Sequence, residues 1–238
     1  AAIEEGFSKY VAIPGIIELR KAICAKLEKD NHLVYSPNEI CVSTGAKQAV
    51  MNALMALCDP GDEVIIPTPC WVSYSEMVKL TGAAPVFVPC KAETGFALNV
   101  DDIAAAVTPH TKAIIICTPN NPTGVLLPRE LLQAALRICR AQGTRVLLDE
   151  CFLDFTGEKS AKDLLSRYEN LLILKAFTKS YALAGLRVGY CLTGDTRLLT
   201  NMAACSQPWN VSVPAQAAAL SVINAAKEHG YLKGPLVA

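Results

Sequence analysis

Two charged side chains, Lys179 and Arg187, stand in the apolar stretch LKAFTKSYALAGLRVGY at residues 174–190. A charge in such surroundings is costly unless it has a partner or a chemical task. A lysine amine can form a Schiff base with a carbonyl group, and an arginine can hold a phosphate. Together they indicate a site for an aldehyde that carries a phosphate. Lys175, in the same stretch, has no evident task, and we expect it at the surface.

Two other segments offer groups for the same ligand. In STGAKQ at 43–48, small residues at a helix start leave the backbone N–H groups of 45–47 free to bind an anion, which the helix dipole also favours. The alternative is that Thr44 is only the N-cap of that helix. Trp71 follows the apolar run EVIIP, and its ring either stacks on a flat ligand or packs in the core.

An amide and a carboxylate are further candidates. Asn121 lies in NNPTG after the apolar run AIIIC, where its amide can donate a hydrogen bond to a ligand oxygen. A simple turn is the alternative, because Asn, Pro and Gly all favour turns. Asp149 ends the run RVLLD, where a carboxylate is either an ion-pair partner or a functional acid.

The elements that must position these groups alternate along the chain. Continuous apolar runs, typical of strands covered on both faces, predict strands at 39–43, 63–67, 85–89, 113–117, 145–149, 171–175 and 186–192. Helical patterns occupy 16–28, 46–58, 71–81, 99–107, 128–142, 161–168, 195–205 and 213–229. This alternation predicts an α/β, three-layer, doubly wound fold with a mainly parallel seven-stranded sheet. In such sheets ligands bind beyond the carboxyl ends of the strands, which is where the candidates lie.

Pyridoxal phosphate is a cofactor whose groups match these candidates. It combines an aldehyde, a phosphate, a ring nitrogen, a phenolic oxygen and a flat face. The lysine, the arginine with the helix-start amides, the aspartate, the asparagine and the tryptophan offer one partner for each. Each motif is weak alone, but five of them at strand ends make a strong signal.

The composition argues against other classes of function. Lys and Arg number 22 against 22 Asp and Glu, so no basic excess points to nucleic acid. No apolar run approaches the roughly 18 residues of a membrane span, and the first residues do not resemble a signal peptide. The ten cysteines are scattered without a CxxC pair, which indicates reduced core thiols, a cytoplasmic location and no metal site.

The chain resembles the fold type I pyridoxal-phosphate enzymes of the class I/II aminotransferase superfamily in six marks: YVAIPGIIELRKAI, STGAKQAV, PCWVSY, NNPTG, LLDECFLDF and FTKSYALAGLRVGY. The first half is most similar to aspartate- and prephenate-type aminotransferases. The second half resembles the branch of histidinol-phosphate aminotransferases and threonine-phosphate decarboxylases. The resemblance implies a cofactor-binding large domain over 1–238, with the N-terminal arm and the small C-terminal domain mostly missing.

The resemblance implies a role for each matching residue. Lys179 would hold the cofactor as a Schiff base and move the proton, and Asp149 would pair with the pyridinium nitrogen. Tyr10 would reach the phosphate of the partner subunit's cofactor, which implies a homodimer. The other expected cofactor contacts are Gly45, Ala46, Lys47 and Arg187 at the phosphate, Trp71 on the ring face, Asn121 at the phenolic oxygen, and Phe152 and Thr178 nearby.

Two positions depart from the family pattern. Phe152 stands where many members have a tyrosine three residues after the aspartate, so a hydrogen bond to the phenolic oxygen is lost. Ala176 stands where a serine or threonine usually helps to bind the phosphate, and Thr178 is a candidate replacement.

The implied activity is a pyridoxal-phosphate-dependent aminotransferase that moves an amino group from an L-amino acid to a 2-oxo acid. Two alternatives stay open. One is a decarboxylase on the same scaffold, which the second half of the chain favours. The other is a catalytically incomplete cofactor-binding fragment, because the arginine that binds the substrate carboxylate lies in the small domain of the family.

Overall fold

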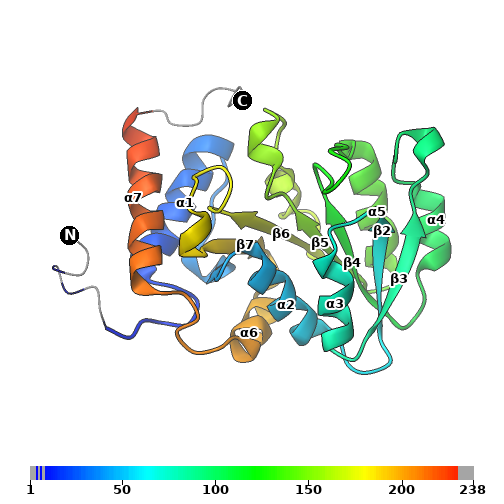
Figure 1. Cartoon of the computed structure of the whole chain (residues 1–238), viewed down its shortest axis with the longest axis horizontal. Helices are drawn as coiled ribbons and strands as arrows, with labels where there is room; N and C mark the ends of the chain where they lie inside the picture. Colours follow the sequence, from blue (N-terminus) through cyan, green and yellow to red (C-terminus); the bar gives the residue numbers. More distant parts are fainter. Residues whose placement is uncertain (1–3, 5, 7–8, 230–238) are drawn as a thin grey trace.

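The computed structural model describes residues 4, 6 and 9–229. They form an α/β fold around one sheet with the strand order β1-β7-β6-β5-β4-β2-β3 (Figure 1). All neighbouring strands pair in parallel except β7, which is antiparallel to both β1 and β6. The mainly parallel seven-stranded sheet is therefore confirmed. The strands are β1 (Ile40–Ser43), β2 (Glu63–Thr68), β3 (Ala84–Pro89), β4 (Thr111–Cys117), β5 (Arg145–Asp149), β6 (Leu171–Ala176) and β7 (Gly189–Thr193).

Helices cover both faces of the sheet, which gives the three layers (Figure 1). Alternate strand residues point to opposite faces, so Leu147 and Leu172 pack under one set of helices, and Leu148 and Ile173 under the other. This is why the central strands carry continuous apolar runs. The first set is α2 (Ala46–Leu57), α3 (Ser73–Leu80) and α6 (Thr196–Cys205), and the second is α1 (Ile17–Asn31), α4 (Val100–Ala106), α5 (Arg129–Ala141) and α7 (Val213–His229).

Between its first two strands the chain crosses from one edge of the sheet toward the other. β1 lies at one edge and β2 lies next to the opposite edge, while β4, β5 and β6 occupy the centre. These three parallel strands end at Cys117, Asp149 and Ala176. The loops that follow them therefore leave the sheet at one common edge, where doubly wound folds bind their ligands.

Lys175 contradicts the expectation of a surface position. It is 4% exposed and lies on the α1 side of β6, next to the core that contains Ile173 and Phe177. Its Nζ is 2.7 Å from Asp154 Oδ1 and 3.8 Å from a Glu150 carboxylate oxygen. These two carboxylates compensate for the burial of the charge.

Two predicted elements were wrong in their extent. The last strand begins at Gly189 rather than at 186, because Ala184–Leu186 form a 3-10 turn and Arg187 has a left-handed φ of 54°. The helix expected at 161–168 is only the 3-10 helix Ala161–Leu164. Beyond Leu164 the chain continues in short turns, in which the Leu165 N–H donates to the Lys162 carbonyl and the Tyr168 N–H donates to the Leu164 carbonyl. The other helices and strands lie close to their predicted ranges.

Some features can be excluded for the described part of the chain. None of its helices combines the length and apolarity that a membrane crossing requires. None of its His, Cys, Asp and Glu side chains gather in groups of three or more that could hold a metal ion. The ten cysteines are free, and five of them are buried.

Candidate active site

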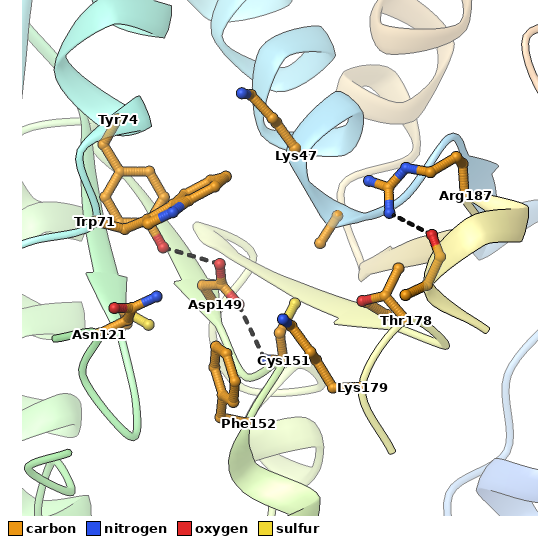
Figure 2. A pocket seen from close by; sticks show the side chains of 14 residues that line it. Lys47, Trp71, Tyr74, Asn121, Asp149, Cys151, Phe152, Thr178, Lys179 and Arg187 are labelled. Atoms are coloured by element: carbon orange, nitrogen blue, oxygen red, sulfur yellow. Dashed lines mark hydrogen bonds between the residues drawn. The ribbon is translucent and has the colours of Figure 1, made fainter. Parts of the chain in front are cut away.

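A cavity of about 230 Å³ opens at the carboxyl ends of the central strands (Figure 2). The last residues of β4, β5 and β6, which are Cys117, Asp149 and Ala176, line it. The cavity brings together all the predicted site residues except Gly45 and Tyr10. The remaining lining residues are Ala46, Lys47, Trp71, Tyr74, Asn121, Cys151, Phe152, Thr178, Lys179, Ala184 and Arg187.

Asp149 is buried at the end of β5, and two donors hold its carboxylate (Figure 2). Tyr74 Oη donates to Oδ2 at 2.8 Å, and the Cys151 N–H donates to Oδ1 at 2.9 Å. Burial, reinforced by the nearby carboxylate, raises the pKa of Tyr74 well above its ordinary value, so the phenol keeps its proton. A carboxylate fixed in this way is suited to accept a hydrogen bond from a protonated ring nitrogen.

Lys179 lies on the turn that follows β6 and is exposed to the cavity. Its Nζ is 5.3 Å from the centroid of the Phe152 ring. Among the described residues no carboxylate forms a salt bridge with it. Figure 2 places its amine and the Asp149 carboxylate around the same space. An amine without an ionic partner can react with a carbonyl group that enters this space.

Arg187 places its guanidinium group beside the start of α2. Its Nη1 donates to the Ala184 carbonyl at 2.9 Å, and a Cβ added to Gly45 would lie 2.9 Å from Nη2. Gly45 also has a φ of +81°, which disfavours any side chain there. The guanidinium group and the first N–H groups of α2 are therefore close together, an arrangement that favours a phosphate.

Trp71 and Lys47 form one wall of the cavity. The Trp71 ring meets Tyr74 edge to face, with ring centroids 5.4 Å apart. Lys47 Nζ lies 5.4 Å from the centroid of the Trp71 ring. The side chain of Lys47 thus contacts this aromatic wall, while its backbone lies in the first turn of α2.

Asn121 lines the cavity from the loop after β4, and its neighbour Asn120 fixes that loop. Asn120 Nδ2 donates to the Pro69 carbonyl at 3.0 Å, and its Oδ1 accepts from Thr123 Oγ1 at 2.8 Å. The first asparagine therefore holds the backbone, and the second presents its side chain to the cavity (Figure 2).

Two predicted residues lie elsewhere or have another partner. Tyr10 is 81% exposed and does not line the cavity, and its ring stacks on Trp209 with centroids 4.2 Å apart. The N-cap interpretation of Thr44 was wrong, because Gly45 occupies the N-cap of α2. The Thr44 hydroxyl instead donates to the Asn210 carbonyl at 2.7 Å, which ties the chain before α7 to this loop.

The prediction missed four lining residues: Tyr74, Cys117, Cys151 and Ala184. A signal for Tyr74 existed, because its spacing of three from Trp71 is that of one helical turn. Nothing in the sequence around Cys117 and Cys151 indicates that they line the cavity. Burial, with a smaller effect of Asp149, raises the pKa of Cys117 to about 12, so this thiol stays protonated beside the carboxylate.

The aminotransferase class I and II family matches residues 1–233. The chain belongs to this family. Among its relatives, the aspartate/prephenate aminotransferase of Cereibacter sphaeroides is 40% identical over an alignment that covers 95% of this chain and 58% of that protein. The aspartate aminotransferase of Bacillus subtilis is 36% identical, over 95% of this chain and 59% of that protein.

A solved structure of a mutant aspartate aminotransferase from Thermus thermophilus superposes on this aminotransferase-family chain with a TM-score of 0.90. The two chains are 33% identical, and the match covers 98% of this chain and 65% of the other. The chain thus spans less than two thirds of the length of each of these relatives.

The family implies pyridoxal phosphate as the cofactor, and the residues present fit that group. Asp149, held by two donors, would take the ring nitrogen, and Lys179 would take the aldehyde. Arg187 and the first turn of α2 would hold the phosphate. Glycine is required at position 45, because a Cβ there would crowd the guanidinium group of Arg187. The flat ring would lie against Trp71.

Proposed function

We propose that this chain is the pyridoxal-phosphate-binding domain of an aminotransferase that moves an amino group from an L-amino acid to a 2-oxo acid. The convergence of Asp149 and Lys179 on one cavity, with Arg187 beside the start of α2, carries the proposal. The aminotransferase names of relatives that are 36% and 40% identical support this class of reaction.

The residues of the cavity would place the cofactor and move protons. When bound, pyridoxal phosphate supplies an aldehyde that takes up the amino group and a ring that withdraws electrons from the substrate Cα. Lys179 would remove the proton from Cα and deliver it to C4′. Asp149, oriented by Tyr74 and the Cys151 N–H, would keep the ring nitrogen protonated. Arg187 would hold the phosphate and so help to keep the ring nitrogen next to the Asp149 carboxylate.

The substrate and the assembly are also part of the proposal. Aspartate is the amino donor to test first, because the relatives named above are aspartate or aspartate/prephenate aminotransferases. We infer a homodimer in which the exposed Tyr10 contacts the cofactor phosphate in the partner subunit, since Tyr10 lies outside the cavity of its own chain. Ten free thiols suit a reducing compartment such as the cytoplasm.

The two alternatives differ in their support. The decarboxylase is not favoured, because the relatives and the solved structure named above are all aminotransferases. Cofactor binding without turnover draws on the same cavity residues, and the measurement below distinguishes it from transamination.

Spectroscopy with a substrate tests the proposal. The chain is loaded with pyridoxal phosphate and mixed with aspartate or glutamate. An aminotransferase converts the cofactor to pyridoxamine phosphate and releases the matching 2-oxo acid. Release of CO₂ would identify a decarboxylase instead, and bound cofactor with neither product would identify a binding domain. Failure to bind pyridoxal phosphate at Lys179 would contradict every form of the proposal.

A further inference from the structure

We propose that Lys175, Asp154 and Ser180 form a positioning network that holds the Lys179 turn in place from the opposite side of the sheet. The inference rests on the proposed function, because it concerns the reactive amine of Lys179. None of the three residues lines the cofactor cavity. They would therefore act through the backbone that carries Lys179, without touching the cofactor.

Lys175 is the centre of the network. It belongs to β6 but points to the face opposite that of Ala176, which lines the cavity. Its Nζ donates to Asp154 Oδ1 at 2.7 Å and to the Glu150 carbonyl at 3.3 Å. A buried lysine with these two contacts links the chain after β5 to the chain of β6.

Ser180 completes the network next to the reactive lysine. Its hydroxyl donates to Asp154 Oδ2 at 3.0 Å, so both oxygens of this carboxylate are engaged, one by each segment. Ser180 is buried, whereas the adjacent Lys179 is exposed to the cavity. The hydrogen bond of Ser180 thus holds the residue that directly follows Lys179, and with it the backbone of the turn.

Glu150 ties the same network to the carboxylate of the active site. It directly follows Asp149, and its own carboxylate accepts from the Ala161 N–H at 2.8 Å and from the Ser160 hydroxyl. Its carbonyl accepts from Lys175 Nζ. The Lys175 ammonium group therefore contacts the segment that follows Asp149, and Asp154, which accepts from both Lys175 and Ser180, links that segment to the turn of Lys179.

The charges of the network stabilise the ion pair between Lys175 and Asp154. Burial acts to lower the pKa of Lys175, but the carboxylates of Glu150 and Asp154 outweigh it, and the pKa is raised overall. The lysine thus stays charged, and its hydrogen bond to Asp154 is charge-assisted. A chemically active side chain needs such support, because a small displacement of its turn would remove the amine from reach of the aldehyde.

Ser180→Ala provides the sharpest test, because it removes one hydroxyl and leaves the Lys175–Asp154 pair intact. Pyridoxal phosphate is titrated into each variant, and its condensation with the Lys179 amine, with loss of one water, is followed by absorbance. Pyridoxamine phosphate, which has the ring and phosphate but no aldehyde, is titrated in parallel. We expect covalent capture to weaken by about tenfold and pyridoxamine phosphate affinity to change by less than about twofold.

Three further variants extend the test. Ser166→Ala, at an exposed serine whose hydroxyl donates to the Asp163 carbonyl, should match the wild-type chain in both titrations. Lys175→Met should weaken capture more than Ser180→Ala does, and Lys175→Arg should restore part of the loss because the cation remains. If Lys175→Met does not fold, the Ser180→Ala comparison decides alone. In the chain without cofactor, the amides of 178–183 should exchange with deuterium faster in Ser180→Ala than in Ser166→Ala.

The outcomes separate this inference from the proposed function. Unchanged capture in Ser180→Ala would overturn the positioning network, and an equal loss of capture and of pyridoxamine phosphate affinity would overturn it as well, since that marks a general structural defect. A wild-type chain that captures no pyridoxal phosphate would overturn the proposed function, and the network with it.

Discussion

The carboxylate of Asp149 is oriented before any ligand binds, because both of its donors belong to the protein. The Tyr74 hydroxyl comes from α3, and the N–H of Cys151 comes from the loop after β5. A group that is already fixed loses little freedom when a ligand contacts it, which strengthens the contact. The Tyr74 hydroxyl should therefore contribute to cofactor binding although it need not touch the cofactor.

Tyr74→Phe should weaken the binding of pyridoxal phosphate by about tenfold, because one of the two hydrogen bonds that orient Asp149 is lost. The ring that packs in the core is kept. The measurement is an absorbance titration at fixed protein concentration. Tyr168→Phe, at a buried tyrosine outside the cavity, serves as the matched control and should bind normally. An unchanged affinity in Tyr74→Phe would show that the hydroxyl has no part in the site.

Single residues could be predicted where their chemistry contrasts with their neighbours in the sequence. Asp149 and Lys179 stand out at the ends of apolar runs, and both line the cavity. Tyr74 was missed, and Lys175 was wrongly expected at the surface. Their partners, Asp149 and Asp154, lie 75 and 21 residues away along the chain. Such pairs depend on the packing of β5, β6 and α3, which no local pattern reveals.

At the scale of elements, β7 approaches the start of α2 so closely that only glycine fits at position 189. A Cβ added to Gly189 would lie 2.8 Å from the Ala46 N and from the Lys175 O. Both are backbone atoms, so neither can rotate out of the way. The strand thereby fixes the first turn of α2 relative to Arg187, which precedes the strand.

Gly189→Ala should lower the free energy of unfolding by about 1–3 kcal/mol, because the added methyl group overpacks this contact. It should also weaken pyridoxamine phosphate binding, since the first turn of α2 must shift. Urea denaturation and a binding titration measure the two effects. Gly185→Ala is the control, because a Cβ at Gly185 meets nothing within 4 Å. Equal stability of the two variants would refute the packing explanation.

The central elements were predictable because burial on both faces gives continuous apolar runs, and β5 has the predicted limits of 145–149. The less regular elements were not. The late start of β7 depends on the left-handed backbone of Arg187. The short helix at Ala161–Leu164 begins where the carboxylate of Glu150 accepts the Ala161 N–H. Both features arise from tertiary contacts around the site.

At the scale of the whole molecule, a buried lysine limits stability. Lys162 is 5% exposed, and its Nζ lies 3.4 Å from Asn31 Oδ1. Burial, with the nearby charges of Lys175 and Lys26, lowers the pKa of Lys162 to about 7. In the unfolded chain a lysine keeps a pKa of about 10.4. Between these values the unfolded state binds more protons, so Lys162 makes the free energy of unfolding rise as the pH rises.

Lys162→Met should therefore stabilise the chain at pH 7, by roughly 1–3 kcal/mol, because no charge has to be buried or neutralised. The gain should shrink at pH 9, because removing the proton from Lys162 on folding costs less free energy as the pH approaches the pKa of a lysine in the unfolded chain. Urea denaturation at both pH values measures it. Lys159→Met, at an exposed lysine, should change stability little at either pH. A loss of stability of equal size at both pH values would contradict the assigned pKa.

Covalent capture of pyridoxal phosphate is the most direct test of the site. The chain is incubated with the cofactor, reduced with borohydride, digested and analysed by mass spectrometry. We expect one cofactor per chain, attached at Lys179, and no attachment in Lys179→Ala, because this lysine lines the cavity opposite the fixed carboxylate of Asp149. Attachment spread over other lysines, or an equal yield in Lys179→Ala, would contradict a pyridoxal-phosphate site in this cavity.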